Sequence, residues 1–255
     1  MLRPISAILA ALLTSMAAEA QSNVRVSEEL GASRQMVVVT SSNWIATTGT
    51  MRRFERVGEG WQMNGPEFPV VLGRGGLGWG RGINPAQQSG PEKREGDGRS
   101  PAGIFLLPYA FGYAAADSVR EIKLPYVQCT SSLECVDDTN SQYYNVILDR
   151  QSVTKPDWKS SEKMRMIDDE YRLGIFIAHN PSPTQPGSGS CVFMHIWKGP
   201  GIPTSGCTAM SPGVMESLLG WLDAPSHPVL IQLPDAEYRR LQKAWALPSL
   251  VNTNP

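Results

Sequence analysis

The sequence predicts a mostly β, single-domain protein with a few flanking α-helices. Short β-rich runs dominate the first half of the chain and recur later, and each is bounded by Gly, Asn, Ser or Pro, residues that separate strands. These runs lie at residues 36–40, 44–48, 51–57, 68–72, 103–107, 144–148, 174–178, 191–197 and 228–233. Helical patterns appear only near the C-terminus.

Two helices are expected late in the chain. The first has Ser211 as its N-cap and Pro212 at its first helical position, and it continues to Leu222. The second begins at Asp235 and carries three large side chains at helical spacing: Tyr238, Leu241 and Trp245.

The first twenty residues are typical of a cleavable export signal. Arg3 precedes an apolar run over residues 5–13, and the segment ends in Ala18-Glu19-Ala20. A membrane anchor or a buried first helix is the alternative, but the run is too short to span a bilayer. We therefore expect a signal peptide over 1–20, a lead-in over 21–34 and one domain over 35–255. The protein is then periplasmic or secreted, without an integral membrane span.

The charge of the chain indicates no nucleic-acid or membrane-surface partner. The 23 basic and 24 acidic side chains nearly cancel and are spread along the sequence. Residues 73–103 are rich in glycine and charge, which predicts either a functional loop that walls a site or a disordered surface insertion. Gly73-Arg74-Gly75-Gly76 lacks the GK[ST] ending of a phosphate-binding loop, so nucleotide binding is dismissed.

The chain contains four cysteines, Cys129, Cys135, Cys191 and Cys207. An even number in an exported protein suggests disulfides. Cys129 and Cys135 bracket a short polar turn and are expected to pair. Cys191 is better placed as a small buried residue, although a disulfide between Cys191 and Cys207 is an alternative.

The most informative segment runs from Cys191 to Ser211. On a strand, successive side chains alternate between faces, so His195 shares one face with Cys191, Phe193 and Trp197. The glycines and prolines at 199–203 then force the chain to turn. This turn is expected to bring Cys207 back toward His195.

These residue types suit acyl transfer by a cysteine. An adjacent imidazole can hold a thiol as a thiolate in an ion pair, which makes Cys207 a nucleophile and His195 its base. A glycine before the cysteine lets the backbone bend, so that the amides of Gly206 and Cys207 can bind the negative charge on the attacked carbonyl oxygen.

The order of a strand-borne histidine, a Gly-rich loop and Thr204-Ser205-Gly206-Cys207 resembles the L,D-transpeptidase (YkuD-like) catalytic domain family. The run from Gly96 to Phe105 is similar to the Thr-Pro-x-Gly-x-Phe strand entry of that family. Together these motifs and the chain between them cover residues 35–233. The resemblance implies a β-sandwich or barrel-like domain, with Cys207 as nucleophile, His195 as general base and the carbonyl of Ile196 as the partner that orients it. It also implies that Gly206 donates an amide to the oxyanion.

The resemblance further implies that the substrate is the stem peptide of peptidoglycan. Cys207 would attack the carbonyl of the diaminopimelate residue, release D-alanine and pass the acyl group to an amine or to water. Neither a metal nor a cofactor is implied, and we expect a monomer. The residues expected to bind substrate are Ser205, Arg99, Trp197, His179 and Thr208.

The chain departs from the family near the cysteine. Where the family usually has a histidine before Gly-Cys and an arginine shortly after, this chain has Ser205 and Thr208-Ala209-Met210. Because arginine binds carboxylates with two hydrogen bonds, Arg99 or Lys198 is expected to supply that charge instead.

Other interpretations of the same residues are open. The protein could be a hydrolase of the L,D-carboxypeptidase or amidase type, or a catalytically silent module that binds peptidoglycan. A zinc site at Cys191, His195 and Cys207 lacks the paired spacing of such sites. Cell-wall hydrolases of the NlpC/P60 kind place cysteine before histidine, and here only His227 follows Cys207. A serine enzyme built on Ser205 lacks a supporting motif.

Overall fold

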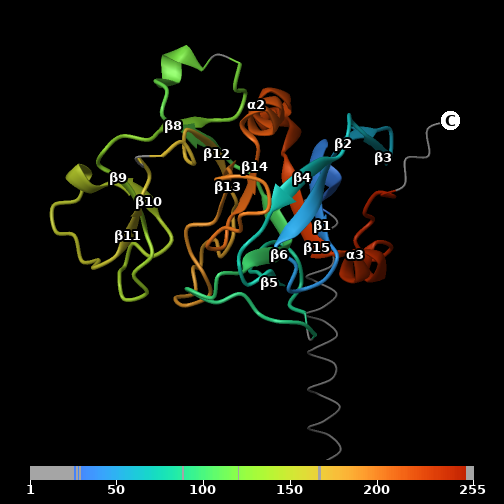
Figure 1. Cartoon of the computed structure of the whole chain (residues 1–255), viewed down its shortest axis with the longest axis horizontal. Helices are drawn as coiled ribbons and strands as arrows, with labels where there is room; N and C mark the ends of the chain where they lie inside the picture. The colour runs from blue at the N-terminus through green and yellow to red at the C-terminus, as the bar shows by residue number, and fades with distance from the viewer. Residues whose placement is uncertain are drawn as a thin grey trace, which may run out of the picture.

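The computed structural model describes residues 26–250, apart from positions 27, 29, 88, 120, 166 and 167 and the side chain at position 118, and it is mostly β (Figure 1). The predicted export signal therefore lies outside the described residues. The strands of the main sheet are β1 (Gln35–Ser41), β2 (Thr48–Val57), β3 (Gly60–Met63), β4 (Phe68–Val71), β5 (Leu77–Trp79), β6 (Ser100–Leu106), β7 (Ala110–Gly112), β8 (Tyr126–Gln128), β12 (Leu173–Phe176), β13 (Phe193–Ile196), β14 (Thr208–Met210) and β15 (Val229–Pro234). A smaller sheet contains β9 (Leu133–Val136), β10 (Ile147–Asp149) and β11 (Ser161–Lys163). The helices are α2 (Pro212–Trp221), α3 (Asp235–Leu241) and the 3-10 helices η1 (Ala116–Ser118), η2 (Arg150–Ser152) and η3 (Ala224–Ser226).

The main sheet is mixed. Its strands lie in the order β5-β6-β15-β1-β2-β4-β14-β13-β12-β7-β8, with β3 paired to β2. Four neighbouring pairs are parallel, β1 with β15, β5 with β6, β7 with β8 and β13 with β14, and the others are antiparallel. Because Met194 lies opposite Thr208 in the β13–β14 pair, the residue before β14 comes to lie beside the start of β13. The sheet order thus brings the predicted nucleophile next to the strand that carries the predicted base.

The centre of the sheet is buried on both faces. All of β1 is buried, and Met36–Val39 are fully inaccessible, as expected for a continuous apolar run covered on both sides. The alternation predicted around His195 is confirmed for β13. Val192, Met194 and Ile196 join the main hydrophobic core, whereas Phe193 belongs to a second cluster.

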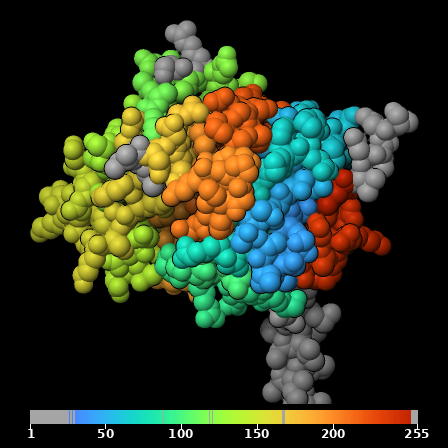
Figure 2. Space-filling view, viewed as in Figure 1, coloured from blue at the N-terminus to red at the C-terminus, as the bar shows by residue number. Residues whose placement is uncertain are grey.

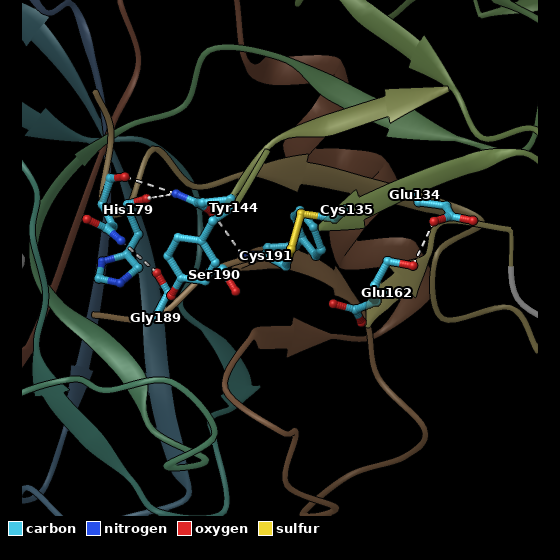
Figure 3. The surroundings of a disulfide bond; sticks show 12 residues. Glu134, Cys135, Tyr144, Glu162, His179, Gly189, Ser190 and Cys191 are labelled. Carbon is cyan, nitrogen blue, oxygen red and sulfur yellow. Dashed lines mark hydrogen bonds between the residues drawn. A yellow bond between two sulfur atoms is a disulfide. The ribbon is translucent and has the colours of Figure 1, made fainter. Parts of the chain in front are cut away.

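Residues 129–164 form a lobe, here called the β9–β11 lobe, which projects from one side of the molecule (Figures 1 and 2). The second hydrophobic cluster joins this lobe to β13 and consists of Phe111, Cys129, Leu133, Cys135, Met164, Tyr171, Cys191, Phe193 and Cys207. A disulfide between Cys135 and Cys191 ties β9 to the segment that enters β13 (Figure 3).

The predicted pairing of Cys129 with Cys135 is therefore wrong, and Cys191 is not a free thiol. Cys129 and Cys207 are the free cysteines, and both are buried. The reason is the course of the chain: the backbone amide of Cys129 donates to the carbonyl of Gly112 at 2.7 Å, while Cys135 lies on β9 and is carried to Cys191.

Several predicted segments differ from the structure. The strand predicted at 191–197 is β13 over Phe193–Ile196, because Cys191 has a φ of 54°, which ends an extended run. Residues 44–48 form a turn, because the side-chain oxygen of Asn43 accepts the amide of Ile45 at 2.9 Å and only Thr48 belongs to β2. The strand predicted at 144–148 begins at Ile147, since Asn145 has a φ of 64°, which ends an extended run. The segment predicted as a loop over 73–103 contains β5 and the start of β6.

The late helices begin where the sequence predicted, but the second ends at Leu241, so Trp245 lies outside it. The first begins at Pro212, although the hydroxyl of Ser211 makes no capping hydrogen bond, and the second begins at Asp235. Within the described part of the chain, no helix has the length and apolar character needed to cross a lipid bilayer.

Candidate active site

A cavity of about 460 Å³ contains both predicted catalytic side chains. Its wall comes from the Gly-rich segment before β6, the β9–β11 lobe, the segment before β12, and the chain from Ser190 to Cys207. His195 and Cys207 both line it, so the structure brings together the pair that the sequence predicted. The Gly-rich segment over residues 73–103 forms part of the cavity wall, which agrees with its interpretation as a loop that walls a site and not as a disordered insertion.

Backbone and side-chain contacts fix Cys207 in place. Its carbonyl accepts hydrogen bonds from the hydroxyls of Ser100 at 2.8 Å and Thr204 at 2.6 Å. Its sulfur accepts the amide of Phe193 at 3.4 Å and lies 3.9 Å from the carbonyl oxygen of Cys191. Cys207, the predicted nucleophile, is thus held by β6, β13 and its own turn.

The Cys207 thiol is protonated at neutral pH. Burial raises its pKa to about 12, and the nearby carboxylate of Glu162 acts in the same direction. The Phe193 amide, Lys93 and the Tyr171 hydroxyl oppose this shift. The expected thiolate–imidazolium ion pair is therefore not the resting state, because burial of the two side chains disfavours both charges.

His195 is oriented as a base. Its Nδ1 lies 2.8 Å from the carbonyl oxygen of Ile196, which is the contact predicted for that residue. A carbonyl can only accept, so Nδ1 carries the hydrogen and Nε2 keeps its lone pair. Burial lowers the pKa of His195 to about 4, although the bond to Ile196 opposes the shift. The imidazole is therefore neutral, and the roles of His195 as general base and of Ile196 as its orienting partner stay predictions.

Gly206 has the backbone that requires glycine, but its amide is not free. Its φ is 151°, and a Cβ at this position would lie 3.1 Å from the backbone oxygen of Arg99. The amide donates to the Thr204 hydroxyl at 3.1 Å, so it does not match the predicted oxyanion donor in this conformation. The equivalent role of the Cys207 amide stays a prediction.

Of the five residues expected to bind substrate, only Ser205 lines the cavity. The guanidinium of Arg99 donates to the carbonyl of Leu77 at 2.8 Å. Thr208 is fully buried on β14, where its hydroxyl donates to Gln232 at 2.7 Å. Trp197 follows β13 and is not a cavity residue. Arg99, Thr208 and Trp197 are therefore not among the residues that line the cavity, and their assignment to substrate binding stays a prediction.

His179 is also a structural residue. It is buried, its Nε2 lies 2.9 Å from the carbonyl of Ser188, and its Nδ1 accepts the amide of Arg81 at 3.3 Å. Its ring meets Phe105 edge to face at 5.9 Å. Burial lowers its pKa to about 3, so it is neutral, and backbone groups engage both of its ring nitrogens. These contacts do not support its assignment to substrate binding, which stays a prediction.

Sequence reasoning missed most of the charged cavity wall. Its cations are Arg74, Lys93 and Lys198, and its carboxylates are Glu95, Asp137, Glu162 and Glu170. Lys198, the alternative to Arg99, does line the cavity and pairs with Glu170 at 3.1 Å. Lys93 is 7% exposed and its ammonium bonds Asp97 at 2.8 Å. A signal for Lys93 existed in the charged run from Glu92 to Arg99, but nothing singled out one residue of that run.

Tyr171 is another cavity residue that the sequence did not suggest. Its ring meets that of His195 edge to face with centroids 5.1 Å apart, and its hydroxyl donates to the carboxylate of Glu162. Tyr171 lies in the segment before β12 and Glu162 on β11, so no local pattern joins either of them to the Gly-Cys motif.

Among the described residues, no group of three or more His, Cys, Asp or Glu side chains is arranged to hold a metal ion. Comparisons of this chain with protein-family models, with curated proteins and with solved structures found no match.

Proposed function

We propose that this protein is an exported cysteine acyltransferase of the L,D-transpeptidase kind, acting on the stem peptides of peptidoglycan. The observation that carries the proposal is the cavity shared by Cys207 and His195, in which Nδ1 is committed to the Ile196 carbonyl and Nε2 is left as a base. The Gly-Cys turn and its resemblance to the family motif supply the substrate class.

The reaction would begin from a neutral pair. As the Cys207 sulfur attacks the carbonyl carbon of the diaminopimelate residue, the thiol proton passes to Nε2 of His195 and a carbon–sulfur bond forms. The carbon–nitrogen bond then breaks, and the amine of D-alanine leaves with the proton from His195. An amine or water attacks the thioester, which gives a crosslink or a trimmed stem and restores the thiol.

The cations of the cavity suit the carboxylates of such a stem. Arg74 is exposed at the rim, whereas Lys93 is buried near Gly206, with its ammonium 4.0 Å from where a Cβ of that glycine would lie. In place of the arginine that follows the cysteine in the family, these two residues are our candidates for carboxylate recognition.

A second candidate, a catalytically silent module that binds stem peptides, is favoured by two observations. The thiol of Cys207 has a pKa of about 12, and the amide of Gly206 is bonded to Thr204. Such a module would bind the same peptide in the same cavity without cleaving it.

Mass spectrometry of the purified mature protein with tetrapeptide stems distinguishes the two. We expect loss of D-alanine, or a crosslinked product, with the wild type and with Cys129→Ala, which removes the other free buried thiol outside the cavity. Cys207→Ala should give neither product. Product from Cys207→Ala would overturn the cysteine mechanism, and stem binding without turnover would favour the silent module.

A further inference from the structure

The Glu162 carboxylate lies beside the candidate nucleophile because of the lobe that carries it. Glu162 sits opposite Cys135 in the β9–β11 pair, and Cys135 is bonded to Cys191 (Figure 3). The hydroxyl of Tyr171 donates to Glu162, and the same hydroxyl is close enough to the Cys207 thiol to stabilise its anion. Tyr171 therefore lies between a carboxylate and a thiol in one cavity.

We propose that Glu162 is a positioning residue that keeps the Cys207 thiol protonated and releases this hold when its carboxylate is neutralised. Ionised Glu162 places a negative charge near the sulfur and engages the Tyr171 hydroxyl as an acceptor. Protonated Glu162 has no charge, so its hydrogen bond with the Tyr171 hydroxyl is weaker. Tyr171 can then donate that hydrogen bond to a thiolate at Cys207 instead.

The surroundings place the ionisation of Glu162 near neutral pH. Burial raises its pKa to about 7; the Tyr171 hydrogen bond opposes this, while the like charges of Asp137, Glu170 and Glu95 add to it. The cations of the cavity do not cancel this effect at Glu162. Lys93 pairs with Asp97, Lys198 pairs with Glu170, and Arg74 is exposed.

His195, which lines the same cavity, does not titrate in this range, because burial lowers its pKa to about 4. A change in thiol reactivity near pH 7 would therefore report on Glu162. This inference concerns the nucleophile of the proposed function, but its test needs no peptidoglycan, so the two can fail separately.

The test is the pH dependence of Cys207 alkylation by iodoacetamide, a neutral reagent, followed by intact mass in a Cys129→Ala background that leaves one free thiol. In the Cys129→Ala reference protein, the second-order rate constant of alkylation rises with pH because the thiolate fraction rises. Once this rise is divided out, we expect the rate constant to show an inflection near pH 7. Glu162→Gln should abolish the inflection and raise the rate at pH 8 about tenfold, the effect of lowering the thiol pKa by about one unit.

Two further variants make the outcome decisive. Glu67→Gln removes an exposed carboxylate that pairs with Arg52 outside the cavity, and it should leave the profile unchanged. Tyr171→Phe should slow alkylation, the opposite of Glu162→Gln, because the thiolate loses a donor. The proposal is overturned if Glu162→Gln keeps the reference profile. If Glu162→Gln does not fold, an unchanged rate in Tyr171→Phe overturns it.

Discussion

The disulfide between Cys135 and Cys191 should account for a large part of the stability of this protein. The bond closes a loop of 56 residues, and the loss of chain entropy in the unfolded state for a loop of that length corresponds to about 4 kcal/mol. A bond between Cys129 and Cys135, which the sequence suggested, would close a loop about tenfold shorter and contribute about 2 kcal/mol. The two pairings are therefore distinguishable by magnitude.

Equilibrium unfolding in urea, with and without a thiol reductant, measures this difference. We expect the reductant to lower the free energy of unfolding of the wild type by about 4 kcal/mol. The double variant Cys135→Ala/Cys191→Ala should be insensitive to reductant, whereas Cys129→Ala should keep the full sensitivity. A shift below about 1 kcal/mol in the wild type, or loss of the shift in Cys129→Ala, would refute the reasoning.

Three further predictions follow from single contacts. Gly206→Ala places a methyl group 3.1 Å from a backbone oxygen, on a backbone with a φ of 151°. It should lower the free energy of unfolding in urea by about 1–3 kcal/mol and abolish any Cys207-dependent product. The control Gly213→Ala, which has open space at its Cβ, should do neither. Ser100→Ala removes the hydroxyl that accepts the buried Gly73 amide at 2.8 Å and that donates a hydrogen bond to the carbonyl of Cys207. It should lower the free energy of unfolding by about 1–3 kcal/mol in the same assay. Acidification from pH 7 to 5 should lower stability by about 2 kcal/mol. His179 and His195 have folded pKa values of about 3 and about 4, below the unfolded value of about 6.5, so each contributes stability above pH 6.5 that is lost as pH falls, about 2 kcal/mol apiece by pH 5. Glu162 has a folded pKa of about 7, above its usual value of 4.5, so it contributes stability that is lost as pH rises. Acidification from pH 7 to 5 therefore raises its contribution to the free energy of unfolding by about 2 kcal/mol, which offsets part of the loss from the histidines. Glu162→Gln should therefore steepen the acid loss to about 4 kcal/mol, and equal stability at both pH values in the wild type would contradict the burial of the histidines.

The parts of the site that the sequence predicted are those set by neighbours in the chain. The strand alternation around His195 and the need for glycine at position 206 depend on a few consecutive residues, and both are present. They follow from strand geometry and from turn conformations that only certain residues adopt. The contact between His195 and the carbonyl of Ile196, which the family resemblance implied, is also present.

The parts that the sequence missed depend on contacts between distant segments. Residues 44–48 have a strand-like composition, but the side chain of Asn43 offers the backbone a competing turn. The partner of Cys135 lies 56 residues away, and spacing alone favoured the nearby Cys129. The same limit applies to Thr208, whose burial against Gln232 is decided by the pairing of whole strands.

Burial disfavours the expected ion pair at Cys207, and the reason bears on the chemistry. Two buried charges lose more solvation than their attraction returns unless other groups compensate. Here burial raises the thiol pKa and lowers that of His195, so both stay neutral. Sequence spacing brings the two residues together, but only the tertiary structure sets their charge.

The β9–β11 lobe links stability and chemistry in one element. It supplies Cys135 to the disulfide, Glu162 to the cavity wall and Asn145, whose side-chain oxygen accepts the amide of Cys191 at 3.0 Å. The carbonyl of that same Cys191 faces the thiol of Cys207. A change in how the lobe packs would therefore alter both the burial of the thiol and the charge beside it. The proposed reactivity of Cys207 would therefore depend on the lobe as well as on the Gly-Cys turn.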